Sequence, residues 1–264
     1  MPTNKQRRQA AQRRLQRQIE RRAELARKRR RNLLIVTAVV AVLVVGGAAW
    51  LIAGVGGGDD DTASASDTSA AATPTVDGSD GTCDFTEDGT GTVGTPPAEV
   101  ATSGLVNLTM TTNVGPIGLV LDQAKAPCAS ASFVYLTQQK FFDGTPCHRE
   151  TDSDGLKVLQ CGDPTGTGTG GPGYSFPTQV TGTETYPRGT LAMANSGQGT
   201  DGSQFFLVYG DSQLSPDYTV VGTIDEAGLA TLDAIAAKGN DGANGPGDGA
   251  PNEPVTIQTM TLGQ

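Results

Sequence analysis

An uncharged apolar run at residues 33–55 does most to limit how this chain can fold. The run reads LLIVTAVVAVLVVGGAAWLIAGV, and its 23 residues would form a helix about 35 Å long, enough to cross a hydrocarbon core of about 30 Å. A helix in a globular core would show a polar face, which this run lacks. A cleaved secretory signal is the alternative, but its apolar region spans only about 7–15 residues. We therefore predict one retained transmembrane helix over residues 32–55.

Charge divides the chain at the same place. Residues 1–31 contain thirteen basic and two acidic residues, whereas the other 233 residues contain six basic and 26 acidic ones. Because basic flanks stay in the cytoplasm, we expect a basic cytoplasmic segment over 1–31 and an extracytoplasmic body after residue 55, on a single-pass protein of the cytoplasmic membrane. The acidic body cannot neutralise a run of phosphates, which argues against nucleic acid as a partner.

Residues 56–98 connect the apolar run to the rest of the chain. The first part reads GGGDDDTASASDTSAAATPTVDGSDGT, and such small, acidic residues cannot bury enough apolar surface to offset the entropy of ordering. We therefore predict a flexible acidic linker over 56–98, with order beginning near Cys83. One compact domain should follow over residues 99–264.

All four cysteines lie after the apolar run, at Cys83, Cys128, Cys147 and Cys161. An even number in an oxidising compartment indicates two disulfides, with three possible pairings. Cys147 and Cys161 flank a turn-like stretch, so we favour a bridge between them, and Cys83–Cys128 would follow. The absence of CxxC spacing and the single histidine argue against a zinc site, and we predict no metal.

The domain reads as mainly β, because short apolar or alternating runs are separated by Gly- and Asn-rich turns. Two segments, 129–139 and 227–238, instead show apolar residues at helical spacing, and Gly239 should end the second. The predicted strands cover residues 106–112, 117–121, 147–150, 158–161, 190–194, 204–209, 219–224 and 255–262. Eight strands and two helices favour a closed barrel capped by helices.

Four stretches carry the chemistry, and they read FFDGTPCHRE (141–150), VLQCGDPTGTGTGGPGY (158–174), LAMANSGQGTDGSQFFLVYG (191–210) and YTVVGTI (218–224). In this order, within residues 103–264, they resemble the cyclophilin family of peptidyl-prolyl cis–trans isomerases, in particular its membrane-anchored, actinobacterial-like bacterial form. The resemblance implies a cyclophilin-like closed eight-stranded antiparallel β-barrel capped by two α-helices. It also implies isomerisation of Xaa-Pro bonds without a cofactor.

The resemblance assigns roles to individual residues. Arg149 matches the catalytic arginine, and Gln160 matches the glutamine that hydrogen-bonds substrate and helps orient the arginine. Asn195 matches the position whose backbone holds the peptide extended. The implied substrate-binding residues are Val158, Met193, Ala194, Gln204, Phe205, Phe206, Leu214 and Tyr218. Phe206 would be the floor of the proline pocket; without the resemblance, Phe205, Phe206 and Leu214 would be read as core.

Three features depart from the family pattern. The stretch between Arg149 and Gln160, ETDSDGLKVL, is longer than usual, and we interpret it as a loop. Lys157 falls where the family places a pocket Phe, so it should either open the pocket or extend out of it, with Leu156 available to fill the gap. Tyr218 stands at a position usually held by His, and an aromatic ring with a polar tip could serve similarly.

We therefore expect a peptidyl-prolyl isomerase that acts on exported proteins outside the cytoplasmic membrane and assists their folding. Its partners would be proline-containing unfolded or extended polypeptides. Uncatalysed prolyl isomerisation takes roughly 10–100 s, which is slow enough to limit folding. The alternative is a cyclophilin-fold binding module or chaperone with little or no turnover, which Lys157 and the longer stretch motivate.

Overall fold

The computed structural model describes residues 78–91, 93–195, 197 and 199–263. The predicted cytoplasmic segment (1–31) and transmembrane helix (32–55) lie outside these residues. Within the described ranges, no helix is both long and apolar enough to cross a membrane.

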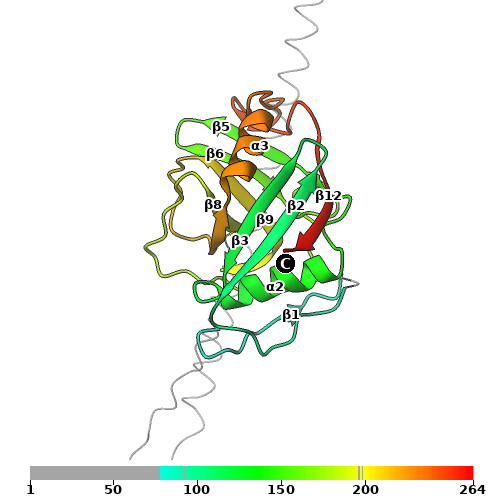
Figure 1. Cartoon of the computed structure of the whole chain (residues 1–264), viewed down its shortest axis with the longest axis vertical. Coiled ribbons are helices and arrows are strands. Elements are labelled where there is room, and N and C mark those ends of the chain that lie inside the picture. Colours follow the sequence, from blue (N-terminus) through cyan, green and yellow to red (C-terminus); the bar gives the residue numbers. More distant parts are fainter. Residues whose placement is uncertain (1–77, 92, 196, 198, 264) are drawn as a thin grey trace, which may run out of the picture. The chain divides into compact units, whose positions relative to one another are not determined.

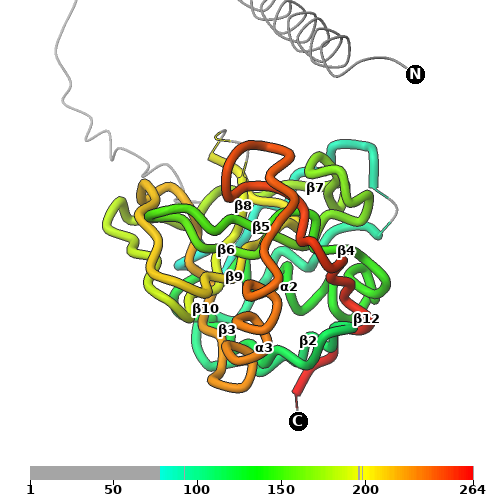
Figure 2. The backbone as a smooth tube through the Cα atoms, turned by 90° about the horizontal axis from the view of Figure 1, so that it is seen from above, coloured from blue at the N-terminus to red at the C-terminus, as the bar shows by residue number. Residues whose placement is uncertain are grey.

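Twelve strands in the described part of the chain pair into an antiparallel sheet. They are β1 (Thr86–Glu87), β2 (Leu105–Thr112), β3 (Pro116–Asp122), β4 (Pro146–Cys147), β5 (Arg149–Ser153), β6 (Leu156–Cys161), β7 (Tyr174–Pro177), β8 (Thr190–Asn195), β9 (Thr200–Gly210), β10 (Val220–Ile224), β11 (Asp248–Gly249) and β12 (Val255–Leu262). The main path runs β11-β5-β6-β9-β8-β10-β3-β2-β12-β4, while β7 pairs with β9 and with β1. β5 is the second strand of this path and β4 is the last. Because only His148 separates β4 from β5 in the chain, the two ends of the path lie close together and the sheet is curled (Figures 1 and 2).

The predicted strands are all present, with 147–150 divided between β4 and β5. The two predicted helices are present as α2 (Pro127–Gln138) and α3 (Glu226–Ala236). A mainly β fold with two helices is thereby confirmed. The sequence did not predict β1, β7 and β11, because strands of two to four residues are too short to display an alternating pattern.

Local signals explain where both helices begin. Pro127 occupies the first turn of α2, where its missing N–H costs no hydrogen bond, and the Ala129 N–H donates to Gln179 Oε1 at 2.9 Å. Asp225 caps α3, because its carboxylate accepts from the Gly228 N–H at 2.6 Å. The helices lie at opposite ends of the curled sheet (Figure 1).

The stretch between Arg149 and Gln160, predicted to be a loop, is a continuous antiparallel hairpin. β5 and β6 stay paired along their whole length and leave only Asp154 and Gly155 in the turn. Asp-Gly suits a two-residue hairpin turn because glycine tolerates positive φ, and Gly155 has a φ of 81°. The loop prediction is therefore wrong, since the additional residues lengthen two strands.

One large apolar core fills the inside of the curled sheet. Along β3, buried residues such as Ile117 and Leu121 alternate with partly exposed ones, as expected for a strand with one face inward. Phe133 of α2 packs on Phe205 of β9 with ring centroids 5.0 Å apart, and Phe142 lies 5.7 Å from both. This core supports the strands from behind, which leaves their outer face free to carry a site.

Both predicted disulfides are present. Cys147–Cys161 joins β4 to β6, and Cys83–Cys128 joins the N-terminal part of the described chain to the first turn of α2. Closing a loop of 45 residues corresponds to about 4 kcal/mol of stabilisation from chain entropy. The compact domain therefore extends at least to Cys83, within the range that the sequence assigns to the linker, and β1 lies in this extension beside α2 (Figure 1).

Candidate active site

A single row of paired residues crosses four neighbouring strands. Arg149 of β5 is paired with Gln160 of β6, Gln160 with Phe206 of β9, and Phe206 with Ala192 of β8. Directly paired residues project to the same face of a sheet. The row therefore places a guanidinium, an amide and an aromatic ring beside one another on the face opposite the core.

A directed chain of hydrogen bonds begins at Arg149. Its Nη1 donates to Gln160 Oε1 at 3.3 Å, and Gln160 Nε2 donates to Gln204 Oε1 at 2.9 Å. Gln204 Nε2 in turn donates to the carbonyl oxygens of Gly168 at 3.2 Å and Gly170 at 2.9 Å. A guanidinium can only donate and a carbonyl can only accept, so both amides are fixed in one orientation. We call these three side chains the polar chain.

Asp248 holds Arg149 from the other side. Its carboxylate oxygens accept from Arg149 Nε at 2.8 Å and from Nη2 at 2.7 Å. This bidentate pair raises the pKa of the guanidinium and lowers the pKa of the Asp248 carboxyl, although partial burial of each group acts in the opposite direction. The two side chains are 33% and 28% exposed, so the arginine is fixed in direction yet accessible to a ligand.

An apolar cluster lies next to the polar chain. The rings of Phe206 and Tyr218 have centroids 5.5 Å apart, and the ring of Tyr186 lies 6.1 Å from both. We call this the apolar site cluster, and its members are Leu156, Val158, Tyr186, Ala192, Ala194, Phe206, Val208, Leu214, Tyr218 and Val220. Five predicted substrate-binding residues are thus brought together: Val158, Ala194, Phe206, Leu214 and Tyr218.

Sequence reasoning missed Tyr186 and Asp248. The buried Tyr186 hydroxyl donates to the Tyr218 carbonyl and accepts from the Tyr218 N–H, both at 3.0 Å, and burial raises the pKa of Tyr186 to about 12. Asp248 lies in the Gly-, Asn- and Asp-rich stretch 240–249, which signals only turns. Pairing of β11 with β5 brings it beside Arg149. Both residues act through contacts between distant segments, so neither has a local signal.

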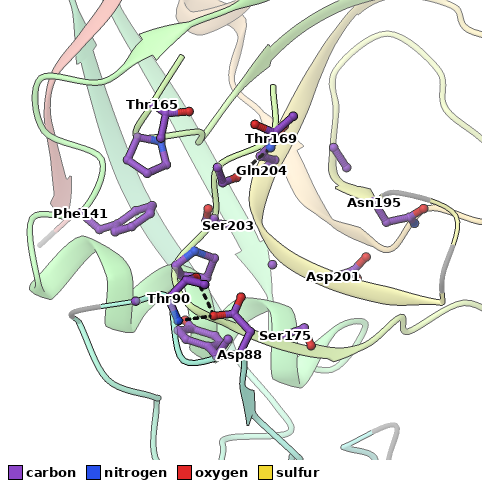
Figure 3. Close-up of a pocket in the computed structure, with 18 of the residues that line it drawn as sticks. Asp88, Thr90, Phe141, Thr165, Thr169, Ser175, Asn195, Asp201, Ser203 and Gln204 are labelled. Atoms are coloured by element: carbon purple, nitrogen blue, oxygen red, sulfur yellow. Dashed lines mark hydrogen bonds between the residues drawn. The ribbon is translucent and has the colours of Figure 1, made fainter. Parts of the chain in front are cut away.

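A groove of about 1000 Å³ opens beside the polar chain (Figure 3). Gln160, Asn195 and Gln204 are among the residues that line it. Asn195 Nδ2 donates to the Asp217 carbonyl at 2.9 Å, and its Oδ1 accepts from the Gly197 N–H at 2.9 Å. The Asn195 side chain therefore links the end of β8 to Gly197 and Asp217 at the edge of the groove.

A sequence model of the family described as "Cyclophilin type peptidyl-prolyl cis-trans isomerase/CLD" matches residues 107–262, which is more than half of the chain. The chain belongs to the cyclophilin family. The match contains every residue of the polar chain, Asp248 and the whole apolar site cluster. It begins within β2 and therefore leaves out residues 78–106, which include β1.

Two curated relatives of this cyclophilin carry the name "Probable peptidyl-prolyl cis-trans isomerase B". The protein of Mycobacterium leprae is 53% identical over 184 residues, which cover 65% of this chain and 60% of that protein. The protein of Mycobacterium tuberculosis is 51% identical over 185 residues, which cover 66% of this chain and 58% of that protein. The chain thus spans less than two thirds of the length of these relatives.

Solved structures share the fold of this cyclophilin. A cyclophilin type peptidyl-prolyl cis-trans isomerase of Cryptosporidium parvum is 28% identical and superposes with a TM-score of 0.54, covering 61% of this chain and 99% of that one. A second structure of that protein, determined in the presence of the dipeptide Ala-Pro, gives a TM-score of 0.53 over 60% of this chain.

Two residues predicted to bind substrate belong to the core of this cyclophilin instead. Met193 and Phe205 are 1% and 0% exposed and pack inside the curled sheet. Side chains alternate along a strand, so Phe205 faces inward where Phe206 faces the site. In the same way Met193 faces inward between Ala192 and Ala194. Met193 and Phe205 are therefore removed from the candidate site, which they support from behind.

Lys157 does not occupy the pocket. Its Nζ lies 3.0 Å from Asp152, and its side chain is 42% exposed. On β6, Leu156, Val158 and Gln160 share one face because side chains alternate, and Leu156 packs against the apolar site cluster. Of the two expectations for Lys157, extension out of the pocket is the one observed, with Leu156 in the apolar position.

Two carboxyl groups are buried close to the site. Glu150 follows Arg149 on β5, faces the core and is 0% exposed, and neither carboxylate oxygen has a hydrogen-bond partner among the described residues. Burial, with a smaller contribution from Asp152, raises the pKa of Glu150 to about 7. Burial also raises the pKa of Asp201 to about 7, although Thr219 Oγ1 donates to it at 2.5 Å.

We predict that the free energy of unfolding decreases as the pH rises from about 5 to 7.5. In this window the folded protein keeps protons on Glu150 and Asp201 that the unfolded chain has already released. Each group can contribute a slope of up to about 1.4 kcal/mol per pH unit. Urea unfolding of the full chain, followed by circular dichroism, measures this slope, and Glu150→Gln should make it shallower.

The exposed Asp154→Asn change in the hairpin turn is the matched control and should leave the slope unchanged. Asp163 does not contribute in this window, because hydrogen bonds from Thr165 and nearby backbone N–H groups outweigh burial and lower its pKa to about 2. Parallel curves for the unmodified chain and Glu150→Gln would contradict the prediction.

Proposed function

We propose that the chain is a peptidyl-prolyl cis–trans isomerase that acts on Xaa-Pro bonds of extended polypeptides. The row Arg149–Gln160–Phe206 carries this proposal, because it sets a fixed cation beside an apolar surface suited to a proline ring. The names of the relatives support it, as does the dipeptide Ala-Pro used with the Cryptosporidium parvum protein.

The reaction needs no bond to be broken, only help over a rotational barrier of about 18–20 kcal/mol. Resonance between the prolyl nitrogen and its carbonyl creates this barrier. A donor that hydrogen-bonds the prolyl nitrogen localises the lone pair and stabilises the twisted state. Asp248 occupies Nε and one N–H of Nη2, so Arg149 can offer Nη1 to the substrate while Gln160 steadies it. Phe206, with the rest of the apolar site cluster, would hold the ring.

A binding module with little turnover is the second candidate. The observation that favours it is the bidentate pair with Asp248, which neutralises part of the charge that Arg149 would bring to the prolyl nitrogen. The two candidates predict the same ligand and differ only in whether bound peptide exchanges between cis and trans faster than free peptide.

We further propose that the curled sheet is a closed eight-stranded barrel. Counting β4 and β5 as one strand, and leaving aside the short β1, β7 and β11, gives eight principal strands. Pairing of β12 with β4 and of β6 with β5 supports closure, because the combined strand then has a neighbour on each side.

We also propose that the domain acts on exported proteins outside the cytoplasmic membrane, where a helix over residues 32–55 tethers it. The uncharged run of 23 residues and the basic segment 1–31 support this topology. The two disulfides are consistent with an oxidising compartment. In this setting a tethered isomerase would meet unfolded chains as they emerge.

We predict that the full chain accelerates cis–trans exchange of an Ala-Xaa-Pro-Phe peptide and that Arg149→Ala lowers kcat/KM about 100-fold, as expected for loss of an electrostatic donor to the transition state. Exchange NMR of the labelled peptide measures both. Arg188→Ala is the matched control, because Arg188 forms a similar bidentate pair, with Asp233 of α3, and belongs to neither the polar chain nor the apolar site cluster. Equal exchange with the unmodified chain and Arg149→Ala, or none with either, would refute the enzyme assignment; binding without exchange would favour the module.

We predict that Asp248 is a positioning residue. Asp248→Ala should lower kcat about tenfold with little change in KM, because it frees the guanidinium without touching the apolar site cluster. Asp248→Glu should retain part of the activity, since a glutamate can still accept two hydrogen bonds from the guanidinium. Asp233→Ala, which removes the partner of Arg188, should leave kcat unchanged. An increase in kcat for Asp248→Ala would show instead that the carboxylate restrains turnover.

We predict that protease added to intact cells removes a C-terminal epitope tag but spares an N-terminal one. This result is expected because residues 1–31 would face the cytoplasm and residues 56–264 the outside. Lysed cells, in which both tags should be lost, are the control. Protection of the C-terminal tag in intact cells would overturn the proposed topology.

A further inference from the structure

A buried carboxylate lies directly behind the site. Glu150 follows Arg149 on β5 and faces the core, where it is 0% exposed and neither carboxylate oxygen has a hydrogen-bond partner among the described residues. An ionised carboxylate in such a place is strongly destabilised, because no donor replaces the water that it has lost. The gain or loss of one proton on Glu150 therefore changes the stability of the strands around it.

The groups that face Glu150 give little support to its charge. Asp152, two residues along the same face of β5, carries a charge of the same sign. On β6 the residue paired with Glu150 is the apolar Leu159. Tyr209 of β9 favours the ionised form slightly, but its hydroxyl donates to the Thr151 carbonyl at 2.6 Å.

The two neighbours of β5 hold it unequally. β6 pairs with β5 at five positions along its whole length, whereas β11 pairs with it at two, Asp248 and Gly249. Gly249 lies directly opposite Glu150. One further backbone hydrogen bond joins the Asp152 N–H to the Gly247 carbonyl at 2.8 Å. The β11 side is therefore the easier of the two to release.

The segment that carries β11 forms a thin cover, and we call residues 240–250 the covering segment. Its residues 241–244 are exposed. Asp241 fills the space beside Gly249, where an added Cβ would lie 2.0 Å from its Oδ1. Because directly paired residues project to the same face, Asp241 lies on the face of the sheet that carries Glu150. Outward movement of the covering segment would therefore admit water to Glu150 and remove a carboxylate of the same sign.

We propose that Glu150 is a pH-dependent switch, whose ionisation releases the covering segment from β5 and withdraws Asp248 from Arg149. Asp248 joins the covering segment to the site, because its carboxylate accepts from Nε and Nη2 of the guanidinium. Once the segment moves out, the guanidinium loses the partner that directs it toward Gln160, and turnover falls. The effect on turnover rests on the proposed function, whereas the release of the segment does not.

Rising pH should favour release. Burial, and less strongly Asp152, raises the pKa of Glu150 from 4.5 to about 7 while the segment is in place. In the released state water reaches the carboxylate, which then recovers its ordinary pKa. The protonated form thus favours the paired arrangement. Release becomes more favourable as the pH rises through about 5 and levels off above about 7.5, with a gain of up to about 60-fold over this window.

Amide hydrogen exchange of the full chain tests the release without reference to activity. The Asp152 N–H should lose protection by up to about 60-fold between pH 5 and 7.5, after correction for the intrinsic effect of pH on exchange. The Asp225 N–H, which donates to the Gly118 carbonyl at 3.0 Å, is the reference and should lose much less. Glu150→Gln and Glu150→Leu cannot ionise at this position, so both should abolish the loss.

Three results would overturn the switch: no loss in the unmodified chain, a loss that persists in both Glu150 variants, or an equal loss at Asp152 and Asp225. The last result would indicate general unfolding instead of release of one segment.

Exchange NMR of the Ala-Xaa-Pro-Phe peptide tests the coupling to the site. The kcat of the unmodified chain should fall by up to about tenfold between pH 5 and 7.5, the limit being the loss expected for Asp248→Ala. Glu150→Gln should keep the high value and Asp248→Ala the low value at every pH. Asp201→Asn removes the other carboxyl with a pKa of about 7 and should retain the decline.

A kcat that is independent of pH in the unmodified chain would overturn the coupling, as would a decline that persists in Glu150→Gln or disappears in Asp201→Asn. The two proposals fail separately. Release seen by amide exchange without turnover at any pH refutes the isomerase and leaves the switch, and turnover without release does the reverse.

Discussion

The site depends on four strands being paired in one particular register. Arg149 lies opposite Gln160, Gln160 opposite Phe206, and Phe206 opposite Ala192, so one row across the sheet carries charge, amide and ring. A slip of one residue in β9 would exchange Phe206 for Phe205 and turn the ring of the site into the core. The hydrogen bond between Gln160 of β6 and Gln204 of β9 opposes such a slip, while the Cys147–Cys161 bridge fixes β4 against β6.

The site also requires that the cation of Arg149 be held in one direction within an acidic domain. Arg149 is one of six basic residues beyond residue 31, and an unrestrained guanidinium would be drawn toward whichever of many carboxylates lies nearest. At an effective dielectric constant of about 20, two unit charges about 4 Å apart attract by about 4 kcal/mol, enough to decide a side-chain conformation. Asp248 takes two of the guanidinium nitrogens and so directs the third along the sheet toward Gln160. The negative charge of Asp248 also weakens the positive field at the site.

Periodicity and motif resemblance predicted much of the domain and failed where contacts are long-range. The eight strand positions, both helices and both disulfides could be predicted, because alternation, helical spacing and cysteine number are local properties. Met193 and Phe205 were placed in the site because a motif does not say which face of the strand a residue occupies. Asp248 and Tyr186 could not be predicted at all, since each reaches the site from a turn-rich segment that only the fold brings near. The hairpin of β5 and β6 was mistaken for a loop because all five residues of β5 are polar or charged and show no alternation of apolar and polar residues.

The contact between Gly91 and Gly173 has a consequence for comparing this protein with its relatives. A Cβ on Gly173 would lie 2.0 Å from the Cα of Gly91, so the two backbones can touch only while both positions are glycine. Substitution at either position would force the N-terminal segment away from the groove, which Gly91 lines. The two glycines therefore form a paired marker: a related chain that keeps both can bring the two segments equally close, and one that has lost either must hold them farther apart.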